Sequence, residues 1–212
     1  MNANDQRDDL VLAAVPHAAF DGWSKAALTV AARDLGLDTG AAARLFPGGP
    51  VEAIAHFVRT ADRRMARDMA ALHPETLRMG ERVFQAVRLR LEPWSGSREA
   101  VRRALAVLAL PRNLALAARL TWGTSDALWT ACGDSSMDFS RYTRRSTLAA
   151  VYAATVLYWL DDPSEGCAGT WDFLRRRLGD VQRLPKLHLK LGNRPVRPGA
   201  ARPHRALRAG GD

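Results

Sequence analysis

Residues 24–50 read SKAALTVAARDLGLDTGAAARLFPGGP, and this stretch decides the expected fold. Ser24 and Thr39 are expected to cap two short helices, because a serine or threonine hydroxyl can accept a hydrogen bond from a first-turn N–H. Pro50 suits the first turn of a much longer helix, whose apolar side chains recur on one face. The expected ranges of these three helices are 25–35, 40–45 and 50–72.

The rest of the chain has the same helical character. Alanine, leucine and arginine dominate, and alternating β-branched runs are missing, so the predicted fold class is all-α. Proline and glycine divide the chain into about nine helices. The helix over 142–160 is apolar nearly all round, which predicts a position in the middle of the bundle. The remaining helices are expected over 8–19, over 74–91, after a Ser97 cap, over 111–131, and through Trp171 to Val181.

This order of elements resembles the layout of tetracycline-repressor-type regulators: three short helices, a long connecting helix and a bundle of longer helices. The expected architecture is therefore a tetracycline-repressor-like bundle with an N-terminal helix-turn-helix-like unit of three helices. We expect three parts in the chain. They are the helix-turn-helix-like unit 1–49, a helical lipid-binding bundle 50–183, and a basic, disordered tail 184–212.

The formal charge of +9 is concentrated at the C-terminal end. Residues 184–212 carry +6 of it, and the remaining 183 residues carry +3. Between Phe20 and Pro50 three basic residues are matched by three acidic ones, and the third helix offers a run of alanines rather than side chains that read base edges. A DNA-binding transcriptional regulator is therefore the alternative function, and no nucleic-acid partner is expected under the leading one.

No combination of residues points to catalysis. The five histidines form no metal-binding pair, no GxSxG elbow occurs, and the glycine pair Gly48–Gly49 lacks the Lys-Ser/Thr of a phosphate loop. Asp134, Asp138, Asp161 and Asp162 fit helix caps and turns better than paired acids. We therefore expect no catalytic residue, no metal and no cofactor.

The expected location follows from the ends and the apolar runs of the chain. The polar, acidic N-terminus shows no signal or transit peptide. The longest strongly apolar run, 148–160, is too short to span a bilayer as a helix. The expectation is a cytoplasmic protein, either soluble or peripheral on the inner face of the membrane.

Residues 133–145, GDSSMDFSRYTRR, resemble the hallmark of the COQ9 family of ubiquinone-biosynthesis accessory lipid-binding proteins. The resemblance continues through 148–160, LAAVYAATVLYWL, and 170–174, TWDFL, and it covers about residues 9–183. The residues that carry it in these segments and nearby are Asp134, Ser136, Asp138, Phe139, Tyr142, Thr143, Arg144, Arg145, Asp162, Ser164 and Arg177. The phrases FDGWS at 20–24 and LPRN at 110–113 are also similar to the family.

The resemblance implies a non-catalytic, usually dimeric protein. Such a protein would hold an isoprenoid lipid or ubiquinone intermediate in an apolar cavity between its helices. It would assist the di-iron hydroxylase that acts on demethoxyubiquinone, a quinone-ring hydroxylase of the pathway. The residues expected to line the cavity are Leu105, Leu108, Leu116, Leu120, Leu128, Val151, Tyr152 and Thr155. The expected partner-facing patch comprises Asp134, Asp138, Phe139, Arg141, Tyr142 and Arg145.

Two features depart from the family pattern. The family places a tryptophan directly before the tyrosine, where this chain has Arg141, so partner contact is expected to be weaker or to use charge. The family can also carry a further amphipathic helix that docks on membrane, whereas here a leucine/lysine alternation follows Pro185. This segment can touch an anionic bilayer or form a small docked strand beside a solvated tail. The expected membrane residues are Lys186, Leu187, Leu189, Lys190 and Leu191.

Overall fold

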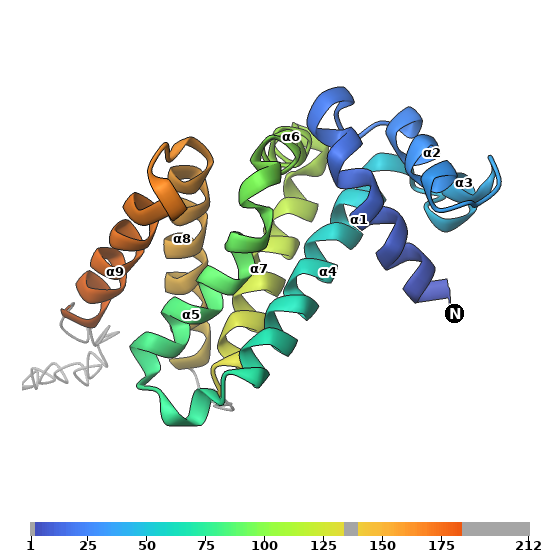
Figure 1. The fold of residues 1–212 in the computed structure, drawn as a ribbon. Coiled ribbons are helices and arrows are strands. Elements are labelled where there is room, and N and C mark those ends of the chain that lie inside the picture. The colour runs from blue at the N-terminus through green and yellow to red at the C-terminus, as the bar shows by residue number, and fades with distance from the viewer. Residues whose placement is uncertain (1–2, 134–139, 184–212) are drawn as a thin grey trace, which may run out of the picture.

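The computed structural model describes residues 3–133 and 140–183, and it confirms the all-α fold class (Figure 1). The described residues form nine α-helices and four 3₁₀ turns. The α-helices are α1 (Ala3–Asp21), α2 (Lys25–Asp34), α3 (Ala41–Leu45), α4 (Gly49–Ala71), α5 (Met79–Leu91), α6 (Arg98–Leu108), α7 (Leu114–Ala131), α8 (Ser140–Asp161) and α9 (Ala168–Arg183).

The N-terminal helices lie at one end of the molecule, and α8 and α9 lie at the other (Figure 1). The short α2 and α3 lie beside α1 at one end, and α4 leads away from them (Figure 1). Helices α5 and α7 pack along α4, α8 packs on α7, and α9 packs on α8 at the opposite end. The three-helix unit, the long connecting helix and the bundle therefore occur in the expected order.

The expected helix caps are only partly correct. Ser24 caps α2 as predicted, because its hydroxyl accepts a hydrogen bond from the Ala27 N–H at 3.0 Å. The prediction for Thr39 is wrong, since the Asp38 carboxylate instead accepts from the Gly40 N–H at 2.9 Å. Ser97 makes no capping bond either: it ends a 3₁₀ turn that runs straight into α6, with ψ near 30° in place of the extended ψ of 164° at Ser24.

Two helices start later than their prolines suggest. Pro74 and Pro111 each open a 3₁₀ turn, so α5 begins at Met79 and α7 at Leu114. His73, directly before the first turn, has a positive φ of 51° and reverses the chain between α4 and α5. Proline fixes its own φ in a range that suits both turn types, so it marks a helical start without fixing the kind of helix.

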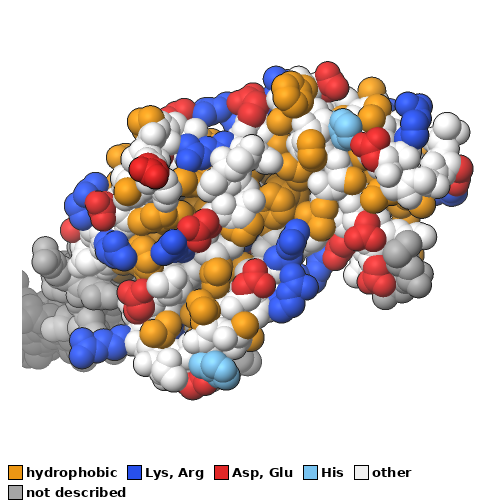
Figure 2. All heavy atoms as spheres, viewed as in Figure 1, with side chains coloured by type: hydrophobic (Ala, Val, Ile, Leu, Met, Phe, Trp, Pro, Cys, Tyr) orange, Lys and Arg blue, Asp and Glu red, His pale blue; other side chains and the backbone are white. Residues whose placement is uncertain are grey.

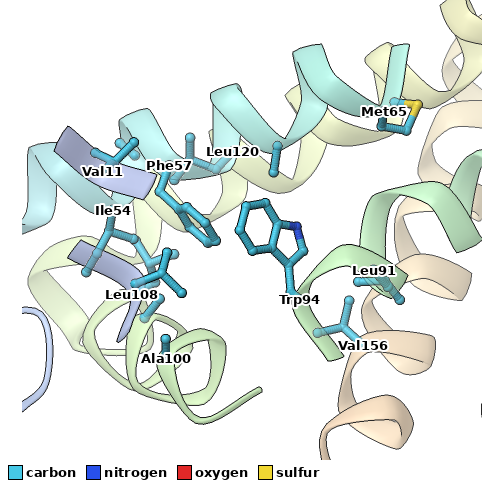
Figure 3. Packing of buried hydrophobic residues seen from close by; sticks show 14 of the residues in the cluster. Val11, Ile54, Phe57, Met65, Leu91, Trp94, Ala100, Leu108, Leu120 and Val156 are labelled. Carbon is cyan, nitrogen blue, oxygen red and sulfur yellow. The ribbon is translucent and has the colours of Figure 1, made fainter. Parts of the chain in front are cut away.

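The inward face of α4 is confirmed, and it forms the middle of one continuous core. Phe57 on this face packs against Trp94, at a centroid distance of 4.8 Å (Figure 3). It also packs against Trp23, at a centroid distance of 5.3 Å. Trp23 also donates its indole N–H to the Ala100 carbonyl on α6 at 2.9 Å. The N-terminal unit and the bundle are thereby held together by shared aromatic packing.

The prediction that α8 is buried on all sides is wrong. Tyr142, Leu157 and Tyr158 of α8 are exposed, with Leu157 at 63%. The reason is its position: α8 packs mainly on α7 and α9, toward one end of the bundle rather than at its centre. An apolar helix in that place leaves apolar side chains on the surface.

Candidate functional site

A cavity of about 350 Å³ lies inside the bundle, between α4, α5, α6, α7 and α8. Its volume falls in the lower part of the range typical of small-molecule sites. The lining is largely apolar, and each of these five helices contributes residues to it. The lining residues are Phe57, Val58, Arg90, Leu91, Trp94, Val101, Ala104, Leu105, Leu108, Ala109, Leu114, Ala117, Leu120, Thr121, Thr124, Tyr152, Ala153, Val156, Leu157 and Trp159.

Half of the expected lining residues lie at this cavity. Leu105, Leu108, Leu120 and Tyr152 line it. The other four, Leu116, Leu128, Val151 and Thr155, lie outside its lining. Thr155 and Leu128 are fully buried in the surrounding core, and the Thr155 hydroxyl donates to the Val151 carbonyl one turn earlier at 2.7 Å.

The helical period explains this division on α8. Tyr152, Val156 and Trp159 are spaced four and three residues apart, so they share the face of α8 that lines the cavity. Each residue along a helix is rotated by about 100° from the one before it, since 3.6 residues make a turn. Val151 and Thr155 therefore point to a neighbouring face and pack in the core.

The wall of the cavity formed by α4, α5 and the following turn was missed by the sequence prediction. Phe57, Val58, Leu91 and Trp94 belong to this wall, and in the sequence they are ordinary apolar positions of helical faces. Trp94 lies between Phe57 and Leu91 in Figure 3. No local motif distinguishes a residue facing a cavity from one facing another side chain.

A buried ion pair also lies at the wall. Arg90 donates from Nε to Asp62 Oδ1 at 2.7 Å and from Nη2 to the Val58 carbonyl at 3.3 Å. Thr124 donates its hydroxyl to the same carboxylate, at 3.1 and 3.0 Å from the two oxygens. Burial lowers the pKa of Arg90, but the nearby Tyr152 oxygen and Asp62 carboxylate outweigh it, so the pKa lies above its usual value. The guanidinium is therefore held in its charged form.

Tyr152 stands next to this pair. Burial raises the pKa of its phenol, the Arg90 charge opposes this shift, and the net direction is upward. The hydroxyl therefore keeps its proton at neutral pH and can act as a hydrogen-bond donor.

The cavity reaches the surface at exposed apolar residues. Leu114, at the start of α7, and Leu157, near the end of α8, both line the cavity and are more than half exposed. The view in Figure 2 shows hydrophobic side chains gathered over the middle of one face, between charged ones. An apolar ligand can thus pass between bulk solvent and the cavity along apolar side chains.

The expected partner-facing patch lies partly outside the described residues. Asp134, Asp138 and Phe139 fall outside them, and Arg141 is described only as part of the α8 backbone. Tyr142 is exposed at 60% and stacks on Trp122 of α7, with ring centroids 6.1 Å apart.

Arg145 does not lie on this surface as expected. It is buried at 2% exposure, and its Nε donates to Asp126 Oδ1 at 2.5 Å. Position 145 follows Tyr142 by three residues, but α7 covers it, so its side chain joins α8 to α7 instead of facing solvent. The expected membrane residues 186–191 also lie outside the described part of the chain.

The helix-turn-helix-like unit shows little that could read DNA. Alanines occupy most of α3, and Arg44 at its end is paired with Asp38 through both guanidinium nitrogens. The hydrogen bonds from Arg44 and from the Gly40 N–H lower the pKa of Asp38 to about 2, so this pair stays charged. On the face in Figure 2, acidic and basic side chains are mixed over α1–α3.

Within residues 3–133 and 140–183, no three His, Cys, Asp or Glu side chains gather in a way that could hold a metal ion. No single described helix is long and apolar enough to cross a membrane. The segments Met79–Leu108 and Pro111–Ala131 reach that length and apolar character only as a pair, across a bend of 92°.

Comparison with known proteins adds a family likeness. Residues 114–185 match the family model described as COQ9. The chain is 32% identical over 183 residues to the "Ubiquinone biosynthesis protein COQ9, mitochondrial" of Homo sapiens, covering 82% of this chain and 57% of that protein. The Schizosaccharomyces pombe relative of the same name is 27% identical over 177 residues, with coverages of 82% and 69%. The chain thus spans little more than half the length of the human relative. The relatives are named as mitochondrial, and the cytoplasmic location of this chain stays a prediction.

A solved structure supports the fold. A TetR transcriptional regulator from Nitrosomonas europaea superposes with a TM-score of 0.68 at 22% sequence identity, covering 84% of this chain and 98% of that one. The expected tetracycline-repressor-like architecture is therefore confirmed. At this level of identity the likeness concerns the fold alone.

Proposed function

The chain belongs to the COQ9 family, and from that premise we propose that it is a non-catalytic accessory protein of ubiquinone biosynthesis. It binds an isoprenoid lipid or ubiquinone intermediate in the cavity between α4 and α8. It then presents the ring to the hydroxylase that acts on demethoxyubiquinone. The observation that carries this proposal is the apolar cavity of about 350 Å³ inside the bundle.

The size and lining of the cavity suit part of such a molecule. A polyprenyl tail is insoluble, and removing apolar surface from water is favourable by about 25 cal/mol per Å². A volume near the lower end of the small-molecule range suits a ring with a few isoprene units rather than a whole long tail. The rest of the tail would leave through the mouth beside Leu114 and Leu157, whose exposed side chains continue the apolar surface.

Native mass spectrometry of the purified full chain, followed by lipid extraction, tests the proposal. We expect a co-purifying isoprenoid or quinone. Ala117→Trp, which places an indole in the cavity wall, should reduce the bound lipid severalfold. Ala118→Trp is the matched control, because Ala118 is exposed on the same helix and does not line the cavity. A lipid-free wild-type protein, or equal loss in both variants, would contradict lipid binding in this cavity.

We propose that the hydroxylase docks at the start of α8, around Tyr142. Exposed aromatic side chains are common anchors of protein interfaces, and Tyr142 is already held in place by its stacking on Trp122. Tyr142→Ala should weaken binding of the pathway's hydroxylase about tenfold or more in a surface-binding assay. Tyr158→Ala is the control, since Tyr158 is also exposed on α8 and stacked on an aromatic ring, that of Phe173. Equal binding by the two variants would place the hydroxylase elsewhere.

A further inference from the structure

The Arg90 guanidinium keeps N–H groups that no described residue accepts. A guanidinium carries five N–H groups, and Arg90 donates from Nε to Asp62 Oδ1 at 2.7 Å and from Nη2 to the Val58 carbonyl at 3.3 Å. Both N–H groups of Nη1 and one of Nη2 therefore remain. Arg90 lines the cavity, and Nη1 is not among the fully covered, unpaired atoms of the described side chains. The free edge of the guanidinium thus borders the space inside the cavity.

The Tyr152 hydroxyl is a second donor beside this edge. It lines the cavity, forms no hydrogen bond to a described residue and, like Arg90 Nη1, is not fully covered. The Arg90 charge and the Tyr152 oxygen are close enough that each shifts the pKa of the other. Because the phenol keeps its proton at neutral pH, both groups offer hydrogens to a ligand.

Acidic side chains are missing from the described lining of the cavity. Arg90 is the one charged side chain among the described lining residues. The Asp62 carboxylate lies outside the lining, and the Thr124 hydroxyl also donates to it, at 3.1 and 3.0 Å from its two oxygens. A ligand in the cavity therefore meets a cation and a phenol before it meets the carboxylate that balances the cation.

A carboxylate suits this pair of donors better than a neutral head group does. Hydrogen bonds between a charged donor and a carboxylate are about twice as strong as those between neutral groups. The Asp62 charge opposes a second anion only in part, because the guanidinium would stand between the two. A diphosphate would bring several negative charges to one cation, whereas a carboxylate brings a single one.

From these contacts we infer that the free edge of Arg90 and the Tyr152 hydroxyl bind the carboxylate of an amphiphile whose apolar chain fills the cavity. The ligand class is an isoprenoid carboxylic acid, or a straight-chain fatty acid that shares this head group. The site favours such an acid over the ester of the same chain. This inference rests on the proposed function, because it requires that an apolar chain enter the cavity.

Calorimetric titration of the delipidated full chain at neutral pH tests this head-group site. Three probes share one isoprenoid chain: geranate, its methyl ester and geranyl diphosphate. Geranate should bind about tenfold more tightly than the ester, because only the carboxylate accepts charge-assisted hydrogen bonds, and it should also bind more tightly than the diphosphate. Tyr152→Phe should weaken geranate binding about three- to tenfold. Tyr158→Phe, which removes a hydroxyl from the same helix outside the cavity, should not change it.

Variants of the ion pair give the sharper test. Asp62→Asn leaves Arg90 without its counter-charge, which the ligand carboxylate then supplies, so geranate should bind about three- to tenfold more tightly and the ester should not. Adding Arg90→Gln to this variant should weaken geranate binding about tenfold or more, and it leaves no buried charge unpaired. Glu92→Gln is the matched control, because Glu92 pairs with Arg88 at 2.8 Å outside the cavity, and it should change neither affinity.

Melting temperatures show which variants are folded. Geranate should raise the melting temperature of Asp62→Asn more than that of the wild-type chain, because a ligand stabilises the folded state in proportion to how tightly it binds. Tyr152→Phe conserves the ring, so it keeps the head-group site testable where the ion-pair variants unfold.

Different results would overturn the head-group site and the proposed function. Ester binding as tight as geranate binding in the wild type, or equal geranate binding by Asp62→Asn and the double variant, would overturn the site and leave lipid binding in place. Tighter binding of geranyl diphosphate than of geranate would overturn the assignment to a carboxylate. Tighter binding of decanoate than of geranate would support the site and contradict an isoprenoid ligand. A wild-type chain that binds none of these probes would overturn the proposed function as well.

Discussion

At the scale of single residues, the Asp62–Arg90 pair makes the sharpest prediction about stability. Asp62→Ala leaves the Arg90 guanidinium buried without its carboxylate, which should cost about 3–5 kcal/mol of unfolding free energy in urea titration. A more exposed pair lies at the end of α5, the helix that carries Arg90: Arg88 bonds Glu92, the first residue after this helix, at 2.8 Å. Glu92→Ala should cost less than about 1 kcal/mol.

A double variant separates the charge from the packing at the same place. Asp62→Ala combined with Arg90→Met removes both charges, so most of the stability lost in Asp62→Ala should return. A double variant as unstable as Asp62→Ala would mean that the loss comes from packing or from the Thr124 hydroxyl rather than from the uncompensated guanidinium.

Only some of the residues that line the cavity could be predicted from the sequence. Leu105, Leu108, Leu120 and Tyr152 were predicted because apolar periodicity and the family resemblance both point at them. Arg90 was not, because its partner lies 28 residues away on another helix and nothing near it in the sequence marks a buried charge. Cavity walls depend on how helices are placed against one another, which local patterns do not contain.

At the scale of the elements, Asp162 joins the end of α8 to the start of α9. Its carboxylate accepts hydrogen bonds from the N–H and hydroxyl groups of both Ser164 and Thr170, between 2.6 and 2.9 Å. The reading of this aspartate as a cap and turn residue is thereby confirmed. Asp162, Ser164 and Thr170 also belong to the family-like pattern, so one physical role accounts for all three.

This connection predicts how stability depends on pH. Burial raises the pKa of Asp162, but the hydrogen bonds from Ser164 and Thr170 outweigh it and hold the pKa well below its usual range. A carboxyl whose pKa is lower in the folded than in the unfolded chain stabilises the fold above its unfolded pKa of about 4, and loses that effect as pH falls further. The unfolding free energy of the wild-type chain should therefore decline steeply below about pH 4.

Substitution of the neighbouring aspartates isolates this effect. Asp162→Asn should cost about 1–3 kcal/mol at pH 7, because the amide nitrogen cannot accept the donated bonds, and its decline in acid should be shallower. Asp161→Asn is the control, since the Asp161 side chain is exposed and forms an ion pair with Arg102 at 2.8 Å. Urea titrations between pH 2.5 and 7 check both. Parallel acid profiles for wild type and Asp162→Asn would assign the acid sensitivity to other carboxyls.

At the scale of the whole molecule, the order of helices was predictable and their depth of burial was not. Breakers such as Gly36 and the Pro47–Pro50 turn fix where helices end, and that order is enough to specify the tetracycline-repressor-like layout. Helix α8 was placed in the centre because its sequence is apolar all round. In the structure it lies toward one end, so Tyr142 and Leu157 are exposed. The apolar content of a helix sets how much apolar surface it could bury. It does not determine which neighbouring helices lie where they would cover that surface.

The distribution of charge leads to the last prediction, which concerns the tail. Residues 184–212 hold +6 of the net +9, and the helix-turn-helix-like unit has its Arg44 engaged by Asp38. The full chain should bind vesicles that contain anionic lipid, with about 1 kcal/mol from each base near the surface, and salt should weaken this binding. A chain ending at residue 183 should lose it, because the body of the protein carries little excess charge.

The same two chains decide between a membrane surface and DNA as the basic partner. Weak, salt-sensitive DNA binding by the full chain would follow from its tail alone, so its loss in the shortened chain is the expected result. DNA binding that survives the deletion, with a steep dependence on salt, would instead locate phosphate contacts in the helical body and support the regulator alternative. Unchanged vesicle binding after deletion would remove the tail from the membrane contact. Since Ala41–Leu45 offers one basic side chain and that one is paired, we expect the helical body to bind neither surface.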